Sequence, residues 1–490
     1  MSPRKPILSR KAPQRITGSM FYKYDACPHW LYFDAHGDPK KMTKRTAFAE
    51  MLLEGGRLHE KDLIAGMAFE EVKARGLEAR AKATLKLMRE GVERIYHGVL
   101  MDDEFVGEPD LLERSDHAGS AFGPYHYVAV DIKSAERLSD SHKYQLACYG
   151  ELLERAQGVR PVDGFILNAS GVRVGFPLAE FMQQFREAVE EVRKCLAGDP
   201  PPPHVSSGCK QSPWFKECVA FAEERDDIAL LYNVKKKVVR ALREHGVRTV
   251  HDAAKLEIDE LHGKDPSFKR ALLERIKLQA TALIEHKDFV RRRFELPAAP
   301  LELFFDIEGD PLEEVEYLFG FLVRRGDLEH YEYQLAERPE QEGEMWAKFL
   351  EWIDALEDDY VVYHYGSYEM TRLGMLERRH GGSAELDRFR DRMVDLNEIV
   401  KDSLVFPLYF YSIKDIGNYI DYKRSDTIKG GGESVAFYEE WLKSGDRKKL
   451  DDIIEYNKDD VLATRWLKDW LAHRLLEHEA ELGESGKRKV

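Results

Sequence analysis

An aspartate and a lysine two residues apart, Asp131 and Lys133, end an alternating hydrophobic run that begins at Tyr127. The alternation predicts a strand with one face toward a core, and its period of two places both polar side chains on the other face. A carboxylate can hold a divalent metal, while a lysine can orient the attacking water or stabilise charge on the phosphate. The pair therefore suits phosphodiester hydrolysis, although the same spacing also occurs in plain surface pairs.

Further polar groups flank this strand in the sequence. Gln145 and Tyr149 are spaced i, i+4 on a helical pattern and so share one helix face. Upstream, the run Gly55 to Glu60 opens a helical stretch and contains His59. The run Gly107 to Leu112, which contains Asp110, is predicted as a short strand. The chain thus carries G-x3-H-E, G-E-P-D, D-I-K and Q-x3-Y in that order.

In this order the motifs resemble those of the RecB-type PD-(D/E)XK nucleases, over roughly residues 16–218. The resemblance implies a restriction-endonuclease-like α/β core. It implies three metal ligands, a catalytic lysine, and two residues that support the site: His59, Asp110, Asp131, Lys133, Gln145 and Tyr149. Glu60 joins the catalytic candidates because it follows the histidine in the motif. A ligand set that contains imidazole favours Mn²⁺ over Mg²⁺.

A second set of acidic residues lies in the C-terminal part of the chain. Asp306 and Glu308 stand two apart in the hydrophobic strand predicted for residues 301–311, hence on one face. Tyr456 and Asp460 share one face of a predicted helix at i, i+4. Acidic side chains on one face repel one another unless a cation lies between them. The pattern therefore favours two divalent metals that clamp a phosphodiester.

The order D-x-E, followed late in the chain by Y-x3-D, resembles the DEDD exonucleases of the RNase H-like superfamily, over about residues 300–471. The resemblance implies three metal ligands and a residue that positions the water: Asp306, Glu308, Asp460 and Tyr456. Glu369 aligns with the second motif, which normally ends in aspartate, and is implied as a further ligand. His364 either shares this work or only packs. The alternative is an RNase H-like fold with impaired chemistry.

Three of the five cysteines, Cys27, Cys209 and Cys218, fall in aromatic-rich segments predicted as loops. Some RecB-type nucleases, Cas4-like proteins among them, hold a [4Fe–4S] cluster through one early cysteine and a late C-x2-C-x5-C group. In this chain Ser212 stands at the middle position, and serine is a poor substitute for a thiolate. The cluster is therefore doubtful: it is lost or held by three thiolates, or it is completed by Ser212.

Residues 226–285 form a separate helical segment whose pattern resembles a helix–hairpin–helix unit. Such units offer backbone N–H groups to a nucleic-acid phosphate without reading sequence. Asn233 occupies the position that usually requires glycine, and asparagine tolerates a positive φ better than most residues. Lys235, Lys236 and Lys237 follow as candidate nucleic-acid-binding residues. The alternative is a helical spacer that binds nothing.

The chain has 490 residues, which is too long for one compact core. We expect a multidomain α/β protein with a RecB-type domain (16–222), a helical linker domain (226–290) and an RNase H-like domain (300–475). The net charge of −15 excludes a uniformly basic surface but not nucleic acid bound by local basic patches. No apolar run is long enough to span a bilayer and no signal peptide is evident, so we expect a cytoplasmic protein without a membrane partner.

These observations predict a nuclease with two metal centres, for Mg²⁺ or Mn²⁺, that acts on DNA, at single strands or ends, in repair, recombination or defence. One alternative is a nucleic-acid-binding module with weak or no cleavage that partners a separate helicase, because the chain has no G-x4-G-K-[ST] phosphate loop. A second alternative is an RNA 3′→5′ exonuclease, which rests on the C-terminal half.

Overall fold

The computed structural model describes residues 14–425, 428 and 430–487. The chain divides into two compact units. Ala49–Glu224, with the chain up to Arg45, forms the first unit, and the chain from Arg225 onward, with Thr46–Phe48, forms the second. The helical segment after Arg225 thus belongs to the same compact unit as the C-terminal acidic residues.

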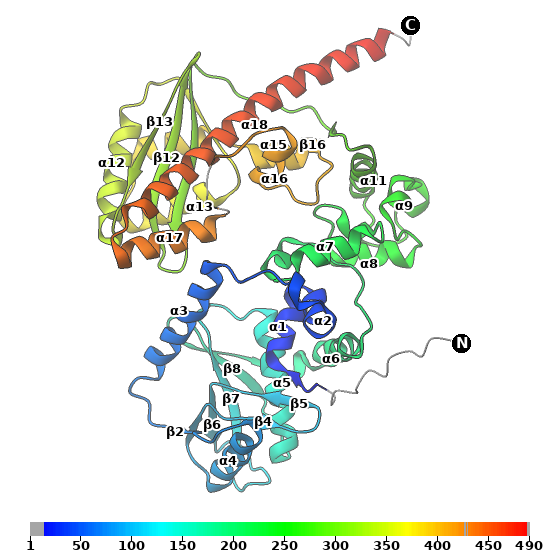
Figure 1. Ribbon diagram of the computed structural model, residues 1–490, viewed down its shortest axis with the longest axis vertical. Coiled ribbons are helices and arrows are strands. Elements are labelled where there is room, and N and C mark those ends of the chain that lie inside the picture. Colours follow the sequence, from blue (N-terminus) through cyan, green and yellow to red (C-terminus); the bar gives the residue numbers. More distant parts are fainter. Residues whose placement is uncertain (1–13, 426–427, 429, 488–490) are drawn as a thin grey trace. The chain divides into compact units, whose positions relative to one another are not determined.

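The first unit is built on a mixed six-stranded sheet in the order β2-β3-β6-β7-β8-β9 (Figure 1). Strand β7 (His126–Ile132) pairs antiparallel with β6 (Leu111–Ser115) and parallel with β8 (Asp163–Leu167). The outer strands are β2 (Glu70–Glu71), β3 (Arg94–Tyr96) and β9 (Arg173–Pro177). A separate three-stranded sheet contains β1 (Ile16–Thr17), β4 (Leu100–Met101) and β5 (Phe105–Gly107).

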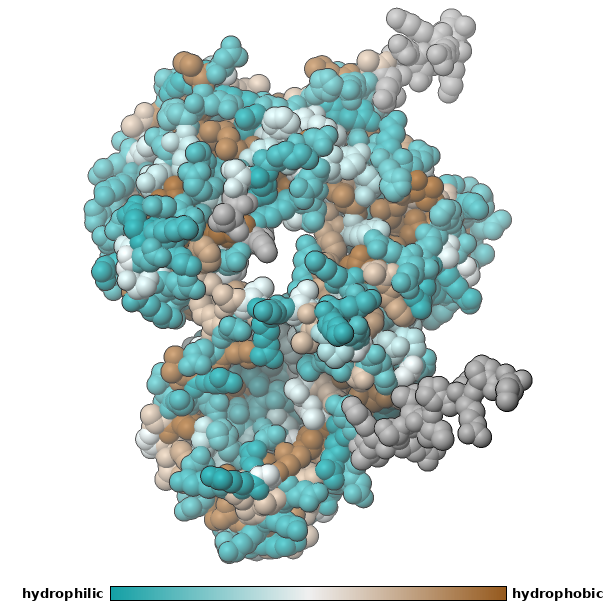
Figure 2. Space-filling view, in the orientation of Figure 1, coloured by the Kyte–Doolittle hydropathy of each residue, from teal (hydrophilic) through white to brown (hydrophobic). Residues whose placement is uncertain are grey.

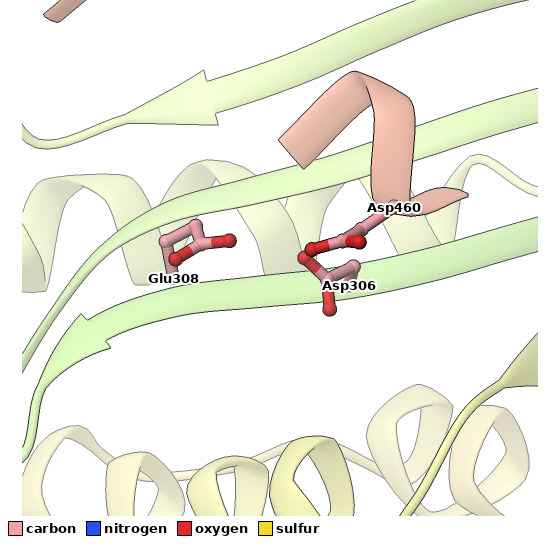
Figure 3. A group of neighbouring side chains, drawn as sticks. All are labelled: Asp306, Glu308 and Asp460. Carbon is pink, nitrogen blue, oxygen red and sulfur yellow. The ribbon is translucent and has the colours of Figure 1, made fainter. Parts of the chain in front are cut away.

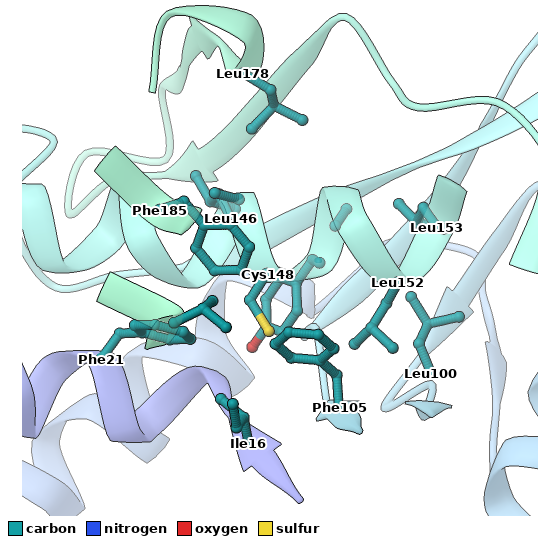
Figure 4. Packing of buried hydrophobic residues seen from close by; sticks show 14 of the residues in the cluster. Ile16, Phe21, Leu100, Phe105, Leu146, Cys148, Leu152, Leu153, Leu178 and Phe185 are labelled. Carbon is teal, nitrogen blue, oxygen red and sulfur yellow. The ribbon is translucent and has the colours of Figure 1, made fainter. Parts of the chain in front are cut away.

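The helices of the first unit are α1 (Gly18–Ala26), α2 (Pro28–His36), α3 (Ala47–Ile64), α4 (Leu77–Glu90), α5 (Asp140–Gln157), α6 (Met182–Ala197) and α7 (Phe215–Glu223). The main core forms where α5 meets strand residues and α6, around side chains such as Phe105, Cys148 and Phe185 (Figure 4). Serine 139 caps α5 in a capping box, which fixes where this helix begins.

All seven residues of β7 are buried, which differs from the expected strand with one exposed face. Tyr127 and Ala129 pack in the main core, whereas Val128 and Val130 pack in a second cluster on the opposite face. Alternation places Asp131 on the face of Tyr127 and Ala129, and Lys133 lies just beyond the end of the strand. Asp110 also differs from expectation, because it lies in the turn between β5 and β6 rather than in a strand.

The second unit begins with the helices α8 (Lys236–Glu244), α9 (Val250–Ala254), α10 (Ile258–Leu261) and α11 (Arg270–Glu285). Asn233, in the turn before α8, has a φ of 53°, a left-handed conformation that asparagine accepts more readily than most residues. After α11, β10 (Phe289–Val290) pairs antiparallel with β16 (Leu404–Val405). This pairing attaches the helical segment to the rest of its unit.

A five-stranded sheet, in the order β13-β12-β11-β14-β15, forms the centre of the second unit. Strands β11 (Leu301–Asp310), β12 (Val315–Arg325) and β13 (Leu328–Leu335) are antiparallel neighbours. Strands β14 (Tyr360–His364) and β15 (Met393–Asp395) continue the sheet in parallel with β11. β11 is therefore the central strand.

Helices cover both faces of this sheet: α12 (Glu342–Asp354), α13 (Tyr368–His380), α14 (Ala384–Asp391), α15 (Leu396–Ser403), α16 (Ile413–Tyr419), α17 (Gly431–Ser444) and α18 (Arg447–Lys487). Odd-numbered residues of β11, such as Phe305, pack with α12, α13 and α14, whereas Phe304 packs with α15, α16 and α18. Figure 1 shows α18 crossing the sheet. The even-numbered face of β11 thus looks toward α18, which decides where the acidic residues of both elements meet.

No helix among the described residues is both long and apolar enough to cross a membrane. The face of the molecule seen in Figure 2 carries mainly hydrophilic residues, with hydrophobic ones scattered among them.

Candidate functional site

Three carboxylates of the second unit meet between the central strand and the last helix. Asp306 and Glu308 stand two apart on β11 and therefore share its α18 face, while Asp460 extends from α18 (Figure 3). One oxygen from each carboxylate lies within 4.8 Å of the others. In the part of the chain that the structure describes, no other group of three histidine, cysteine, aspartate or glutamate side chains meets this spacing.

A buried amide fixes the orientation of Asp306. Asn457, which is fully buried on α18, donates through Nδ2 to Oδ2 of Asp306 at 2.8 Å and to its backbone oxygen at 3.3 Å. The hydroxyl of Tyr331 in turn donates to Oδ1 of Asn457 at 2.9 Å. Gly320, paired with Asp306 across the sheet, leaves the necessary room, since a Cβ there would lie 1.5 Å from Asn457 Oδ1.

Burial raises the pKa of all three carboxyl groups, and repulsion between carboxylates adds to the rise at Asp306 and Glu308. Burial has the largest effect on Asp306, and the charges of Glu308 and Asp460 add to it. Burial and then the charge of Asp460 raise the pKa of Glu308 to about 8. A divalent cation removes both penalties, because it replaces lost solvation and compensates the repulsion. Carboxylate oxygens are ligands that Mg²⁺ and Mn²⁺ prefer, so the residues present fit such an ion.

Glu369 and Tyr456 adjoin this group without belonging to the closest three. A hydrogen bond between Asp306 and Glu369 raises the pKa of Asp306 further, after burial and the neighbouring charges. Glu369 is also 3.2 Å from Nδ1 of His364, and both of these side chains are buried. Tyr456 hydrogen-bonds to Asp460, and burial, followed by the charge of Asp460, raises the pKa of its hydroxyl. Both residues predicted from the sequence therefore lie at the edge of the acidic group.

Two basic residues that the sequence analysis did not select also face this group. Nη1 of Arg424 donates to Oδ1 of Asp460 at 2.6 Å. Nζ of Lys414 lies 4.5 Å from the ring centroid of Tyr456, and its charge lowers the pKa of Glu308 and Asp460 against the effect of burial. The sequence offers no spacing that would link them to Asp306, which lies more than a hundred residues away. Asn457 did leave a signal, since it is a polar residue between Tyr456 and Asp460 on the same helix.

The five-stranded sheet and its acidic centre agree with a comparison against protein families. Residues 303–472 match the model of the RNase H superfamily. The second unit therefore contains an RNase H-like domain. The match includes Asp306, Glu308, Glu369 and Asp460, and a domain of this kind points to a nuclease-type hydrolase. A comparison of the chain with curated proteins gives no match.

In the first unit, Asp110, Asp131 and Lys133 come together at the end of β7. Lys133 Nζ is 2.6 Å from Oδ2 of Asp131, and the backbone N–H of Asp110 donates to Oδ1 of Asp131 at 3.3 Å. Oδ2 of Asp110 accepts from the N–H of Ile132 at 2.6 Å. Burial and the charge of Asp131 raise the pKa of Asp110, whereas Lys133 opposes that rise. Burial would lower the pKa of Lys133, but the two aspartates raise it.

His59 and Glu60 lie together on α3, but only Glu60 is shown to affect this site. The charge of Glu60 contributes to the raised pKa values of Asp110, after burial and Asp131, and of Lys133, after the two aspartates. Its carboxylate accepts from the hydroxyl of Tyr96 at 2.8 Å. Nε2 of His59 is buried and has no hydrogen-bond partner among the described residues, and His59, Asp110 and Asp131 do not all lie within 4.8 Å of one another. The three predicted ligands are therefore less closely gathered than the three carboxylates of the second unit.

Gln145 and Tyr149 form the expected pair on α5. Nε2 of Gln145 donates to the hydroxyl of Tyr149 at 2.7 Å, and that hydroxyl donates to the backbone oxygen of Glu108 at 3.3 Å. Gly107 allows this approach, because a Cβ at that position would lie 2.7 Å from the tyrosine ring. The pair thus holds the turn that carries Asp110.

The three candidate cluster cysteines come together in one buried group with Trp214. The Sγ atoms of Cys27 and Cys218 are 3.6 Å apart, and Cys27 also hydrogen-bonds to Cys209. Cys218 lies within α7 rather than in the expected loop. The hydroxyl of Ser212 accepts from the backbone N–H of Trp214 at 3.1 Å. A [4Fe–4S] cluster is held by four thiolates, and this group offers three, so its residues do not fit such a cluster.

Lys235, Lys236 and Lys237 are exposed at the start of α8, whereas the next two residues, Val238 and Val239, are buried. The guanidinium of Arg275 donates to the backbone oxygens of Tyr232 and Asn233 and holds the turn that precedes these lysines. The placement leaves the side chains of all three lysines exposed.

Proposed function

We propose that the chain is a divalent-metal-dependent nuclease that hydrolyses phosphodiester bonds of DNA, at single strands or ends. The observation that carries this proposal is the convergence of Asp306, Glu308 and Asp460 within 4.8 Å in a domain that matches the RNase H superfamily. Buried carboxylates that repel one another are costly unless a cation binds between them. A divalent cation held in this way is suited to the hydrolysis of a phosphodiester.

In this proposal Asp306, Glu308 and Asp460 hold Mg²⁺ or Mn²⁺, with Glu369 as a further ligand beside Asp306. The metal supplies Lewis acidity and charge neutralisation at the phosphate. Asn457 keeps Asp306 aimed at the shared space, and Tyr456 orients the attacking water through its hydroxyl. Because the site is buried, the local dielectric constant is low, which strengthens each of these electrostatic interactions. The polarity implied by the DEDD resemblance is 3′→5′.

The first unit is proposed as a RecB-type nuclease domain with a second centre. Its support is the contact of Asp110, Asp131 and Lys133 at the end of β7, together with the Gln145–Tyr149 pair. His59 and Glu60 complete the proposed set from α3, and Mn²⁺ is the preferred ion for a set with an imidazole. The helical segment with Lys235, Lys236 and Lys237 is proposed to bind the phosphate backbone as a helix–hairpin–helix-like unit.

The test is a cleavage assay on end-labelled DNA and RNA, single- and double-stranded, in Mg²⁺, Mn²⁺ or EDTA. The parent chain is compared with Asp306→Ala, Asp131→Ala and the double variant. Metal-dependent shortening of DNA that disappears in the double variant supports the proposal. Faster cleavage of RNA than of matched DNA favours the alternative RNA exonuclease, because the RNase H-like match does not discriminate between the two. Salt-sensitive binding without cleavage favours a binding module for a separate helicase.

A further inference from the structure

Two cations stand beside the acidic group of the RNase H-like domain, and both come from the chain between β16 and α17. Lys414 lies in the first turn of α16, and Arg424 follows that helix. The guanidinium of Arg424 is 5.6 Å from the centroid of the Tyr456 ring and the ammonium of Lys414 is 4.5 Å from it. Tyr456 thus lies within reach of both charges, next to Asp460.

The fold holds Arg424 in place through a second aspartate. Asp459, which is buried, accepts from the hydroxyl of Tyr422 at 2.7 Å and from the N–H of Ser425 at 2.7 Å. One of its oxygens also lies 3.8 Å from Nε of Arg424. The successive residues Asp459 and Asp460 therefore do different work. Asp460 belongs to the carboxylate group, whereas Asp459 fixes the segment that delivers the guanidinium.

A site built only to hold divalent cations is not expected to contain two further cations. Lys414 and Arg424 would repel a metal ion held by Glu308 and Asp460, because like charges repel strongly in a buried environment. Their presence is explained when the site also receives an anion. A nucleic-acid phosphate is the anion that the proposed reaction brings there, and guanidinium and ammonium groups are its usual protein partners.

We propose that Lys414 and Arg424 bind the non-bridging oxygens of the scissile phosphate and stabilise the negative charge that develops on it. This inference rests on the nuclease function proposed above. During hydrolysis the water oxygen forms a bond to phosphorus, the bond from phosphorus to the leaving sugar oxygen breaks, and the proton released by the water ends on that oxygen. Lys414 and Arg424 stay charged throughout, and their hydrogen bonds strengthen as charge accumulates on the phosphate.

The experiment uses an Asp131→Asn background, which silences the centre proposed in the first unit. In this background it compares Lys414→Met, Arg424→Gln and Arg424→Lys with the parent and with Lys423→Met. Lys423 neighbours Arg424 but its side chain is 81% exposed, so it serves as the matched control. Three quantities are measured: kcat on single-stranded DNA, Mn²⁺ affinity by electron paramagnetic resonance, and binding of thymidine 5′-monophosphate in the presence of Mn²⁺.

Lys414→Met and Arg424→Gln should each lower kcat about a hundredfold, as removal of one preorganised charge-stabilising donor does elsewhere. Both should weaken mononucleotide binding while Mn²⁺ affinity stays equal or increases, because a repelling charge is gone. Arg424→Lys should keep part of the activity, and it tests the same point if Arg424→Gln does not fold. Lys423→Met should match the parent.

Two results overturn the inference and leave the nuclease function intact: variants that cleave and bind the mononucleotide like the parent, or variants that lose activity only in proportion to lost Mn²⁺. A parent chain that neither binds Mn²⁺ nor cleaves any substrate defeats the proposed function itself, and this inference with it.

Discussion

The two acidic sites of this chain compensate their buried charge in different ways. At the end of β7, Lys133 lies 2.6 Å from Asp131, so the first unit carries its own counter-charge within the site. On β11, Asp306 and Glu308 face Asp460. Arg424 pairs with Asp460, and Lys414 lowers the pKa of Glu308 and Asp460, but no contact of either cation with Asp306 is seen among the described residues. In the first site Lys133 opposes the rise in the pKa of Asp110, whereas burial and the charges of Glu308, Asp460 and Glu369 all raise the pKa of Asp306. Metal dependence should therefore be steeper in the RNase H-like domain.

The largest effect is expected from Asp306→Asn, which removes one charge from the shared group and keeps the shape of the side chain. Cleavage by the RNase H-like domain should fall by about a thousandfold or more, since a ligand common to the site is lost. Assays on end-labelled single strands, in an Asp131→Asn background that silences the first unit, measure this loss. Glu313→Gln, an exposed carboxylate after the same strand, is the control. Unchanged cleavage would show that the acidic group is not catalytic.

A smaller but still large effect is expected from Gly320→Ala. The added Cβ would lie 1.5 Å from Asn457 Oδ1, so Asn457 must move and release Asp306. Activity should fall about a hundredfold, and overpacking should cost about 1–3 kcal/mol of stability. Gly374→Ala on α13, where the new Cβ meets nothing nearer than 3.6 Å, is the matched control and should keep full activity. If Gly320→Ala leaves kcat intact, Asn457 does not position Asp306.

Without metal, the thermal stability of the protein should decrease as pH rises, and a bound divalent metal should oppose this decrease. Burial and then the charge of Asp460 raise the pKa of Glu308 from 4.5 to about 8, so the folded state holds this proton more tightly than the unfolded chain. The stabilisation is fully present below pH 4.5 and is lost as pH rises through about 8. In EDTA, Tm should therefore decrease by several degrees between pH 5 and pH 8.

Addition of Mn²⁺ should raise Tm more at pH 8 than at pH 5, because the ion binds ionised carboxylates. Differential scanning calorimetry of the parent and of Glu308→Gln measures both effects, and the variant should show a flatter pH profile. If the Tm of the metal-free protein rises with pH over this range, the pKa of Glu308 is not raised in the folded state.

The smallest effect is expected from replacing Lys235, Lys236 and Lys237 together with alanine. These exposed side chains can add only screened, surface contacts to a phosphate backbone. Binding of single-stranded DNA should weaken by about tenfold at low salt, with a shallower dependence on salt concentration. Fluorescence anisotropy measures both, and the triple arginine variant, which keeps the charges, should bind like the parent. Equal binding by the alanine variant favours a helical spacer.

The sequence predicted those parts of the sites that depend on local periodicity. The two-residue spacing of Asp306 and Glu308 and the helical spacing of Tyr456 and Asp460 determine shared faces without any knowledge of the fold. The burial of both faces of β7 was not predicted, although Tyr127 to Val130 form a continuous apolar run that is typical of a strand buried on both faces. The turn at Asp110 was missed as well, although Pro109 is a sequence signal for the end of a strand.

Contacts between distant segments could not be predicted from the sequence either. Arg424 and Lys414 approach the acidic group only once the strands of the sheet and the helices around them have folded together. The position of Asn457 in turn requires that residue 320 has no side chain. The convergence of Cys27 with Cys218, by contrast, follows the resemblance on which the motif was selected, although Ser212 removes one expected ligand. Long-range geometry thus supplied Arg424, Lys414 and Asn457, while periodicity supplied the candidate carboxylates and Tyr456.

A single helix, α18, links the acidic group to the far side of its unit. It carries Asn457, Asp459 and Asp460, and further along Arg474 donates to Asp288, which lies just before β10. Inserting one residue between positions 461 and 473 would rotate everything after it by about 100° relative to everything before it. The acidic half would keep its register on the sheet, but Arg474 would turn away from Asp288. Such an insertion would break the contact between Arg474 and Asp288 and leave the carboxylate group of α18 in place.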